Sequence, residues 1–138
     1  MSNAGPDQLR LIPLFTDLPS ETLTAIASLA TPFTVRAGHV LVERGQAGSG
    51  IFLIEDGRVE VDLDSGRKIE LGPGAFFGEL SLLTDRHRTA RVHAVTEVKG
   101  LAIGRREFEE LVETQPRLAS AMLRVLASRL AEAQEHVV

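Results

Sequence analysis

The sequence of 138 residues contains no cysteine, no tryptophan and no tyrosine. A chain without cysteine can form no disulfide, and it can supply no thiolate nucleophile and no cysteine-ligated zinc or iron–sulfur site. No apolar run approaches the ~18–20 residues of a membrane-spanning helix, so the sequence predicts no membrane segment. The net charge of −4 argues against nucleic-acid binding by this segment. We expect a cytoplasmic protein.

Catalytic and metal-binding patterns are also missing. The four histidines stand at positions 39, 87, 93 and 136, and no two of them form a His-x-His or His-x-x-x-His pair. A metal site on a small β-roll would need ligands grouped in this way. Serine, histidine and aspartate occur without a nucleophile elbow. The sequence therefore predicts no metal site, no cofactor and no enzymatic activity.

The composition fits a single domain. Hydrophobic residues make up 43% of the chain, which is enough for an ordinary core at this length. The first four residues, Met1 to Ala4, are typical of an expression scar. We therefore expect one domain over residues 5–138.

Helical patterns stand at the two ends of this domain. We expect helix from Leu11 to Ala30, where Leu23, Ile26, Ala27 and Ala30 fall on one face. Ser20, after a proline, is a suitable N-cap. Residues 105–113 form a second amphipathic segment. Pro116 interrupts it and suits the first turn of another helix, which we expect over residues 116–137.

Short strands are expected between these helices, over about residues 33–104. Segments rich in Val, Ile and Leu alternate there with glycine-bearing turns. Asp56-Gly57 predicts a hairpin turn after a strand at Ile51–Glu55. Arg91–Thr96 and Val98–Ile103 are expected to form a second strand pair. Helix, many strands and helix again is the pattern of a mainly β fold, a β-roll with flanking helices.

The last helix carries two apolar stripes. One has the alternating four- and three-residue spacing of a coiled-coil seam, which predicts a homodimer through residues 119–137. The alternative is a single broad stripe that covers the domain's own core. The second stripe suits packing on the roll. The seam consists of Ala119, Leu123, Leu126, Leu130, Ala133 and Val137, and the second stripe of Leu118, Met122 and Val125.

The segment from Gly78 to Ala90 is the candidate binding site. Gly78 lets the backbone approach a ligand closely, and the turn after it points free N–H groups outward as an anion site. Arg88 can bind two phosphate oxygens with its planar fork, and Thr89 adds a hydroxyl beside them. Glu79 would repel a phosphate, so a neighbouring hydroxyl donor is its natural partner. The combination indicates a pocket for a phosphate attached to a sugar.

The same residues resemble a known family. Phe77-Gly78-Glu79-Leu80-Ser81-Leu82-Leu83, followed by Arg88-Thr89-Ala90, is similar to the phosphate-binding cassette of cyclic nucleotide-binding domains. Ala37-Gly38, Gly45, the run from Ile51 to Val61 and Gly72-Pro73-Gly74-Ala75-Phe76 extend the resemblance over roughly residues 10–135. The resemblance implies a double-stranded β-helix, a jelly-roll-like β-roll, over residues 33–104, with the cassette at residues 76–90.

The resemblance also implies roles for the site residues. Arg88 would neutralise the cyclic phosphate, and Glu79 would accept a hydrogen bond from the ribose 2′-OH. The ligand would be cAMP, with cGMP as a second ligand because Thr89 offers a hydroxyl to a guanine amino group. Gln134 could bind a base edge where activator proteins of the family carry a Thr-Ser pair. The further phosphate donors would be the backbone amides around Gly78, Leu80, Ser81, Thr89 and Ala90.

The expected function is therefore that of a sensor domain. Nucleotide binding would be coupled to movement of the C-terminal helix. Two alternatives stay open: the effector half of a catabolite-activator-type transcription regulator, and a dimerisation or scaffold module that binds no nucleotide.

Overall fold

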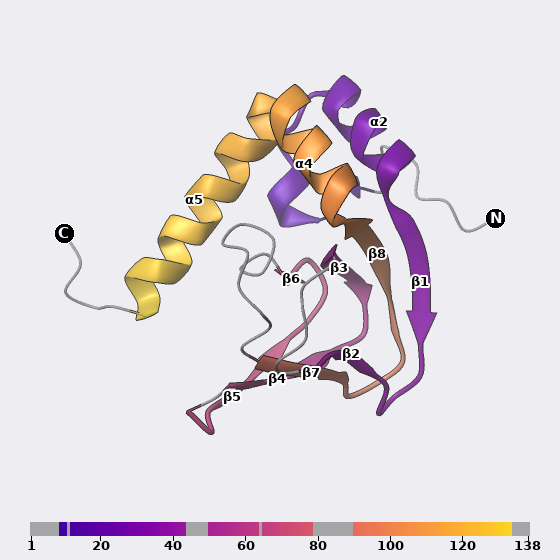
Figure 1. Cartoon of the computed structure of the whole chain (residues 1–138), viewed down its shortest axis with the longest axis vertical. Coiled ribbons are helices and arrows are strands. Elements are labelled where there is room, and N and C mark those ends of the chain that lie inside the picture. Colours follow the sequence, from indigo (N-terminus) through magenta and orange to yellow (C-terminus); the bar gives the residue numbers. More distant parts are fainter. Residues whose placement is uncertain (1–8, 11, 44–49, 64, 79–89, 134–138) are drawn as a thin grey trace.

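The structure is a computed structural model that describes residues 9–10, 12–43, 50–63, 65–78 and 90–133. Two four-stranded antiparallel sheets form a roll, and helices gather at one end of it (Figure 1). The predicted mainly β fold with flanking helices is confirmed.

The two sheets draw their strands from the whole length of the roll. The first sheet has the order β1-β8-β3-β6, and the second has the order β2-β7-β4-β5. Neither order follows the sequence, because the chain passes repeatedly from one sheet to the other. The first sheet consists of β1 (Thr31–Val35), β8 (Val98–Gly104), β3 (Gly50–Asp56) and β6 (Phe76–Phe77). The second consists of β2 (Val40–Val42), β7 (Ala90–Ala94), β4 (Val59–Leu63) and β5 (Lys68–Leu71).

Two predicted strand pairs are wrong for this reason. Asp56-Gly57 does not close a hairpin, because β3 belongs to the first sheet and β4 to the second. Likewise β7 and β8 are consecutive strands but do not pair. Gly57 has a φ of 94° and sits where a Cβ would collide with the carbonyl oxygen of Glu97. The glycine therefore serves a close crossing between the two sheets.

The consecutive strands β4 and β5 do pair with each other. β4 and β5 pair antiparallel, and Val59 lies opposite Leu71. The turn between them is closed by hydrogen bonds from Leu63 N to Arg67 O, 2.9 Å, and from Gly66 N to Leu63 O, 2.9 Å.

The helical end also differs from the prediction in detail. The single helix expected over residues 11–30 is a 3-10 turn and a separate α-helix, with Pro19 between them in extended conformation. Ser20 is the first helical residue and not the N-cap, and its hydroxyl accepts a hydrogen bond from Arg10 at 2.9 Å. The helical elements are η1 (Pro13–Phe15), α2 (Ser20–Leu29), α4 (Arg105–Thr114) and α5 (Pro116–Ala133). The predicted start of the last helix at Pro116 is confirmed.

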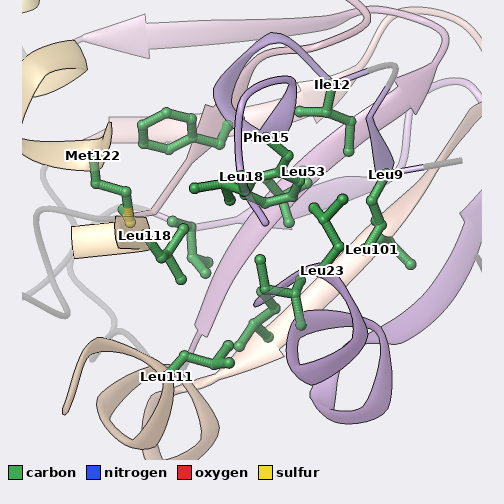
Figure 2. Close-up of a cluster of buried hydrophobic side chains, with 14 of the residues drawn as sticks. Leu9, Ile12, Phe15, Leu18, Leu23, Leu53, Leu101, Leu111, Leu118 and Met122 are labelled. Carbon is green, nitrogen blue, oxygen red and sulfur yellow. The ribbon is translucent and has the colours of Figure 1, made fainter. Parts of the chain in front are cut away.

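A first core cluster joins the helices to the outer face of the first sheet (Figure 2). Leu23 and Leu111 from the helices are fully buried there, and Leu101 from β8 is 1% exposed. The second stripe of the last helix also packs here, with Leu118 2% and Met122 5% exposed. α5 is thereby fixed to the domain over its first two turns.

A second core cluster fills the inside of the roll. It contains Ile54 and Val98 from the first sheet and Val59 and Val92 from the second. Three phenylalanine rings cross this interior. Phe33 and Phe52 meet edge to face at 5.8 Å, and Phe52 stacks on Phe77 at 5.1 Å. The first sheet thus has cores on both faces, whereas the second has one.

Candidate functional site

Strand β6 leads directly into the candidate site. Its two residues pair with the middle of β3, Phe77 opposite Phe52 and Phe76 opposite Leu53. Both β6 side chains are buried, Phe76 in the first cluster and Phe77 in the second. The entrance to the cassette is therefore held from both faces of the sheet.

Gly78 follows β6 with a φ of 98°. Residues with a Cβ adopt this region only at a cost, so the position favours glycine. The main chain can therefore leave the buried strand and turn sharply at Gly78. Its predicted role toward a ligand stays a prediction.

Ala90 marks the other end of the cassette, where strand β7 begins. It pairs with Leu63 of β4, in the second sheet. The next residue, Arg91, points to the other face and forms an ion pair with Glu43 at 3.4 Å. The cassette thus starts at the edge strand of one sheet and ends in an inner strand of the other.

Most of the predicted ligand-binding side chains lie outside the described residues. This holds for Glu79, Leu80, Ser81, Arg88 and Thr89. Gln134 also lies outside, just beyond the described end of α5. Of the predicted set, Gly78 and Ala90 are described, and their placement fixes the two ends of the cassette.

Sequence reasoning missed a contact made by Arg129. From α5, its Nη2 donates a hydrogen bond to the carbonyl oxygen of Phe76 at 3.1 Å. Its guanidinium carbon lies 4.2 Å from the centroid of the Phe76 ring. These residues are 53 positions apart. No local pattern signals such a contact, because an arginine on a helix is usually solvated.

The described residues also contain a groove of about 490 Å³ between η1 and α5. Neither Gly78 nor Ala90, the two described members of the predicted ligand-binding set, lines it. Its walls combine apolar side chains with two arginines and an aspartate. The lining residues are Pro13, Leu14, Asp17, Leu18, Arg117, Ser120, Ala121, Arg124 and Val125.

The described part of the chain contains no group of three or more His, Asp or Glu side chains placed to hold a metal ion. None of its helices is long and apolar enough to cross a membrane.

Comparison with known proteins agrees with the geometry of the roll. The sequence profile of the cyclic nucleotide-binding domain matches residues 32–115. A cyclic nucleotide-gated potassium channel of Rhizobium etli is 36% identical over 118 residues, covering 86% of this chain and 33% of the channel. A cAMP-dependent protein kinase regulatory subunit of Yarrowia lipolytica is 34% identical over 106 residues, covering 75% of this chain and 28% of that subunit.

Among solved structures, the catabolite activator protein of Thermus thermophilus matches with a TM-score of 0.79 and 31% identity. The match covers 88% of this chain and 59% of that structure. The chain spans about a third of the length of the channel and kinase relatives. Profile, relatives and fold agree, and the chain belongs to the cyclic nucleotide-binding domain family.

Proposed function

We propose that this chain is a regulatory sensor that binds cAMP, and cGMP more weakly, in a pocket formed by the cassette. Three kinds of relative carry a similar domain in their sequence or structure: a gated channel, a kinase regulatory subunit and a catabolite activator. The observation that carries the proposal is the backbone of Gly78, with its φ of 98° directly after a buried strand. That geometry supports a close backbone approach to an anion at the start of the cassette.

In the proposed complex, Arg88 binds the cyclic phosphate and Glu79 accepts a hydrogen bond from the ribose 2′-OH. Backbone amides of Leu80, Ser81, Thr89 and Ala90 donate further hydrogen bonds to the phosphate, and Gln134 contacts the base. These roles are what the resemblance to the family's phosphate-binding cassette implies. The domain acts in the cytoplasm and catalyses no reaction.

Titration calorimetry on Arg88→Ala tests the proposal. A hydrogen bond to a charged group contributes ~1.5–3 kcal/mol, so losing a bidentate contact should cost roughly 2–4 kcal/mol, or ~30- to 1,000-fold in Kd. Arg86→Ala is the matched control, because it removes an arginine from the same segment without a proposed ligand contact. Unchanged cAMP affinity in folded Arg88→Ala would refute the assignment.

A ligand analogue isolates the role of Glu79. Glu79→Ala should weaken binding of cAMP but leave binding of 2′-deoxy-cAMP nearly unchanged, because the analogue lacks the donor. For Thr89, we expect cGMP to bind more weakly than cAMP by no more than ~10–100-fold, and Thr89→Ala should widen that ratio. An unchanged ratio would remove the proposed role of the Thr89 hydroxyl.

We further propose that α5 reports occupancy by moving over the base, and that two chains associate through residues 119–137. The seam residues Leu123 and Leu130 are 69% and 51% exposed. Such exposure of large apolar side chains favours a partner surface. Leu126 lies partly buried against the first core cluster, so it is a poor place to probe association.

The double variant Leu123→Glu/Leu130→Glu should convert a dimer into a monomer when mass is measured by light scattering. A wild-type mass of one chain would rule out the dimer.

Two alternative functions, a scaffold module and the effector half of a transcription regulator, are distinguished by other measurements. A scaffold module would gain no thermal stability from cAMP, and the effector half of a transcription regulator would be attached to a DNA-reading domain.

A further inference from the structure

The first half of α5 is fixed to the body of the domain. Gln115 ends α4 with a hydrogen bond from its N–H to Leu111 O, 2.8 Å, and its carbonyl accepts from Leu118 N at 3.0 Å as α5 begins. The side chain of Gln115 also accepts a hydrogen bond from the buried hydroxyl of Thr22 at 2.9 Å. With Leu118 and Met122 in the first core cluster, this half of the helix cannot move without disrupting the core.

The second half of α5 is attached differently. After Leu126, none of the described side chains of α5 belongs to either core cluster. Arg129 nevertheless reaches the roll, with its hydrogen bond to the Phe76 carbonyl and its guanidinium over the Phe76 ring. The distal turns are thus held by a polar contact, whereas the proximal turns are held by a core.

Phe76 is a rigid partner for this contact. Its side chain is 2% exposed, and its strand pairs with β3 through Leu53. Phe76 also stands two residues before Gly78, at the entrance to the cassette. Arg129 therefore connects the least anchored part of α5 to the strand from which the binding segment departs.

We propose that Arg129 is a positioning residue, which holds the distal half of α5 beside β6 and so prepares the helix to cover the nucleotide. The inference rests on the proposed function for its ligand, and it assigns the coupling to one pair, Arg129 and Phe76. When the contact is formed, a fraction of the molecules already has the helix in the binding-competent arrangement, and ligand binding shifts the remaining molecules to it. When the contact is lost, fewer molecules have the helix in place. The apparent affinity for the nucleotide is then reduced in proportion to the fraction that remains competent.

Arg129→Gln removes the charge and the planar fork but keeps a helix-forming residue of similar length. A charged hydrogen bond and a cation–π contact are lost, so cAMP affinity should fall roughly 3- to 30-fold. Arg124→Gln is the matched control, one and a half turns earlier on the same helix and exposed. It should leave affinity unchanged. Equal effects of the two variants would overturn the proposal.

A second measurement asks whether Arg129 acts through Phe76. Phe76→Leu keeps a buried apolar side chain but removes the ring. If Arg129 acts through the ring, Arg129→Gln should weaken binding at least about twofold less in the Phe76→Leu background than in the wild type. Fully additive effects would overturn the part of the proposal that rests on the Phe76 ring, because Phe76→Leu keeps the main-chain carbonyl that accepts the hydrogen bond from Arg129.

Hydrogen exchange without ligand separates this inference from the proposed function. Arg129→Gln should raise amide exchange in residues 127–133, with no change in residues 117–122, and Arg124→Gln should change neither. If the wild type binds no cyclic nucleotide, the proposed function fails, yet this exchange pattern would still report the contact. Unchanged exchange in Arg129→Gln would show that the contact does not hold the helix.

Discussion

Both sheets are built from short antiparallel strands, yet they differ in how many of their faces are exposed to water. The first sheet lies between the helical layer and the interior of the roll, so β3 carries apolar residues on both faces. The second sheet closes the roll and presents an outer face of charged side chains, such as Glu60 and Lys68 at 3.8 Å. The first sheet is therefore packed on both faces, whereas the second is packed only on the face that points into the roll. The cassette begins in the first and ends in the second.

The sharpest test of this comparison replaces one leucine by alanine in each sheet. Leu101→Ala on β8 removes a side chain that is 1% exposed, and the resulting cavity should lower the free energy of unfolding by roughly 3–5 kcal/mol. Leu71→Ala on β5 affects a partly buried residue at the border of the second cluster and should cost about 1 kcal/mol. Denaturant unfolding measures both. Equal losses would mean that the sheets contribute alike.

A second test concerns the turns. Gly57→Ala, where the chain leaves the first sheet, combines a φ of 94° with a collision against Glu97 and should cost about 2–3 kcal/mol. Gly66→Ala, within the second sheet, has a φ of 87° but open space around the new Cβ. It should cost only about 1 kcal/mol. Thermal unfolding of the pair checks the difference, and a larger loss at Gly66 would contradict it.

The helical layer that covers the first sheet offers a third test. Thr22→Val removes the buried hydrogen bond to Gln115 and should destabilise the domain by about 1–2 kcal/mol. Thr24 on the same helix is exposed, and its hydroxyl donates to Ser20 O within the helix. Thr24→Val should therefore change stability by less than about 0.5 kcal/mol. A larger effect at Thr24 would show that the layer is not fixed by the Thr22 contact.

The smallest effect is expected on the outer face of the second sheet. Glu60→Gln removes the charge that faces Lys68 and His93, whose side chains are 62% and 31% exposed. Such surface pairs contribute little, so the loss should stay below about 0.5 kcal/mol and shrink further at high salt. Chemical unfolding at low and high ionic strength measures it. A loss above about 1 kcal/mol would show that this face contributes to stability after all.

The same contrast explains how far the sequence could be interpreted. The strands predicted at Ile51–Glu55 and Val98–Ile103 are present as parts of β3 and β8. The partners of those strands were not predictable, because a period of two specifies faces and not neighbours. Gly57 therefore suggested a hairpin that the sheets do not form.

The candidate site divides in a similar way. The local spacing from Gly78 to Ala90 predicts a phosphate-binding segment, since the residues that define it are close in sequence, and the roles of its side chains stay predictions. The contact of Arg129 with Phe76 was not predictable, because it depends on where α5 lies relative to β6. Ser20 was mistaken for an N-cap because its sequence context fits, whereas the extended Pro19 places it inside the helix.

The row of Phe33, Phe52 and Phe77 has a spectroscopic consequence. Each ring lies within 5.8 Å of the next, so ring currents should spread the proton resonances of all three. With six phenylalanines, four histidines and no tryptophan or tyrosine, the aromatic region of a proton NMR spectrum is sparse. Phe77 stands one residue before Gly78 and is thus a native reporter of the binding segment. Ligand titration should shift the Phe77 signals most, with smaller shifts at Phe52 and smaller still at Phe33.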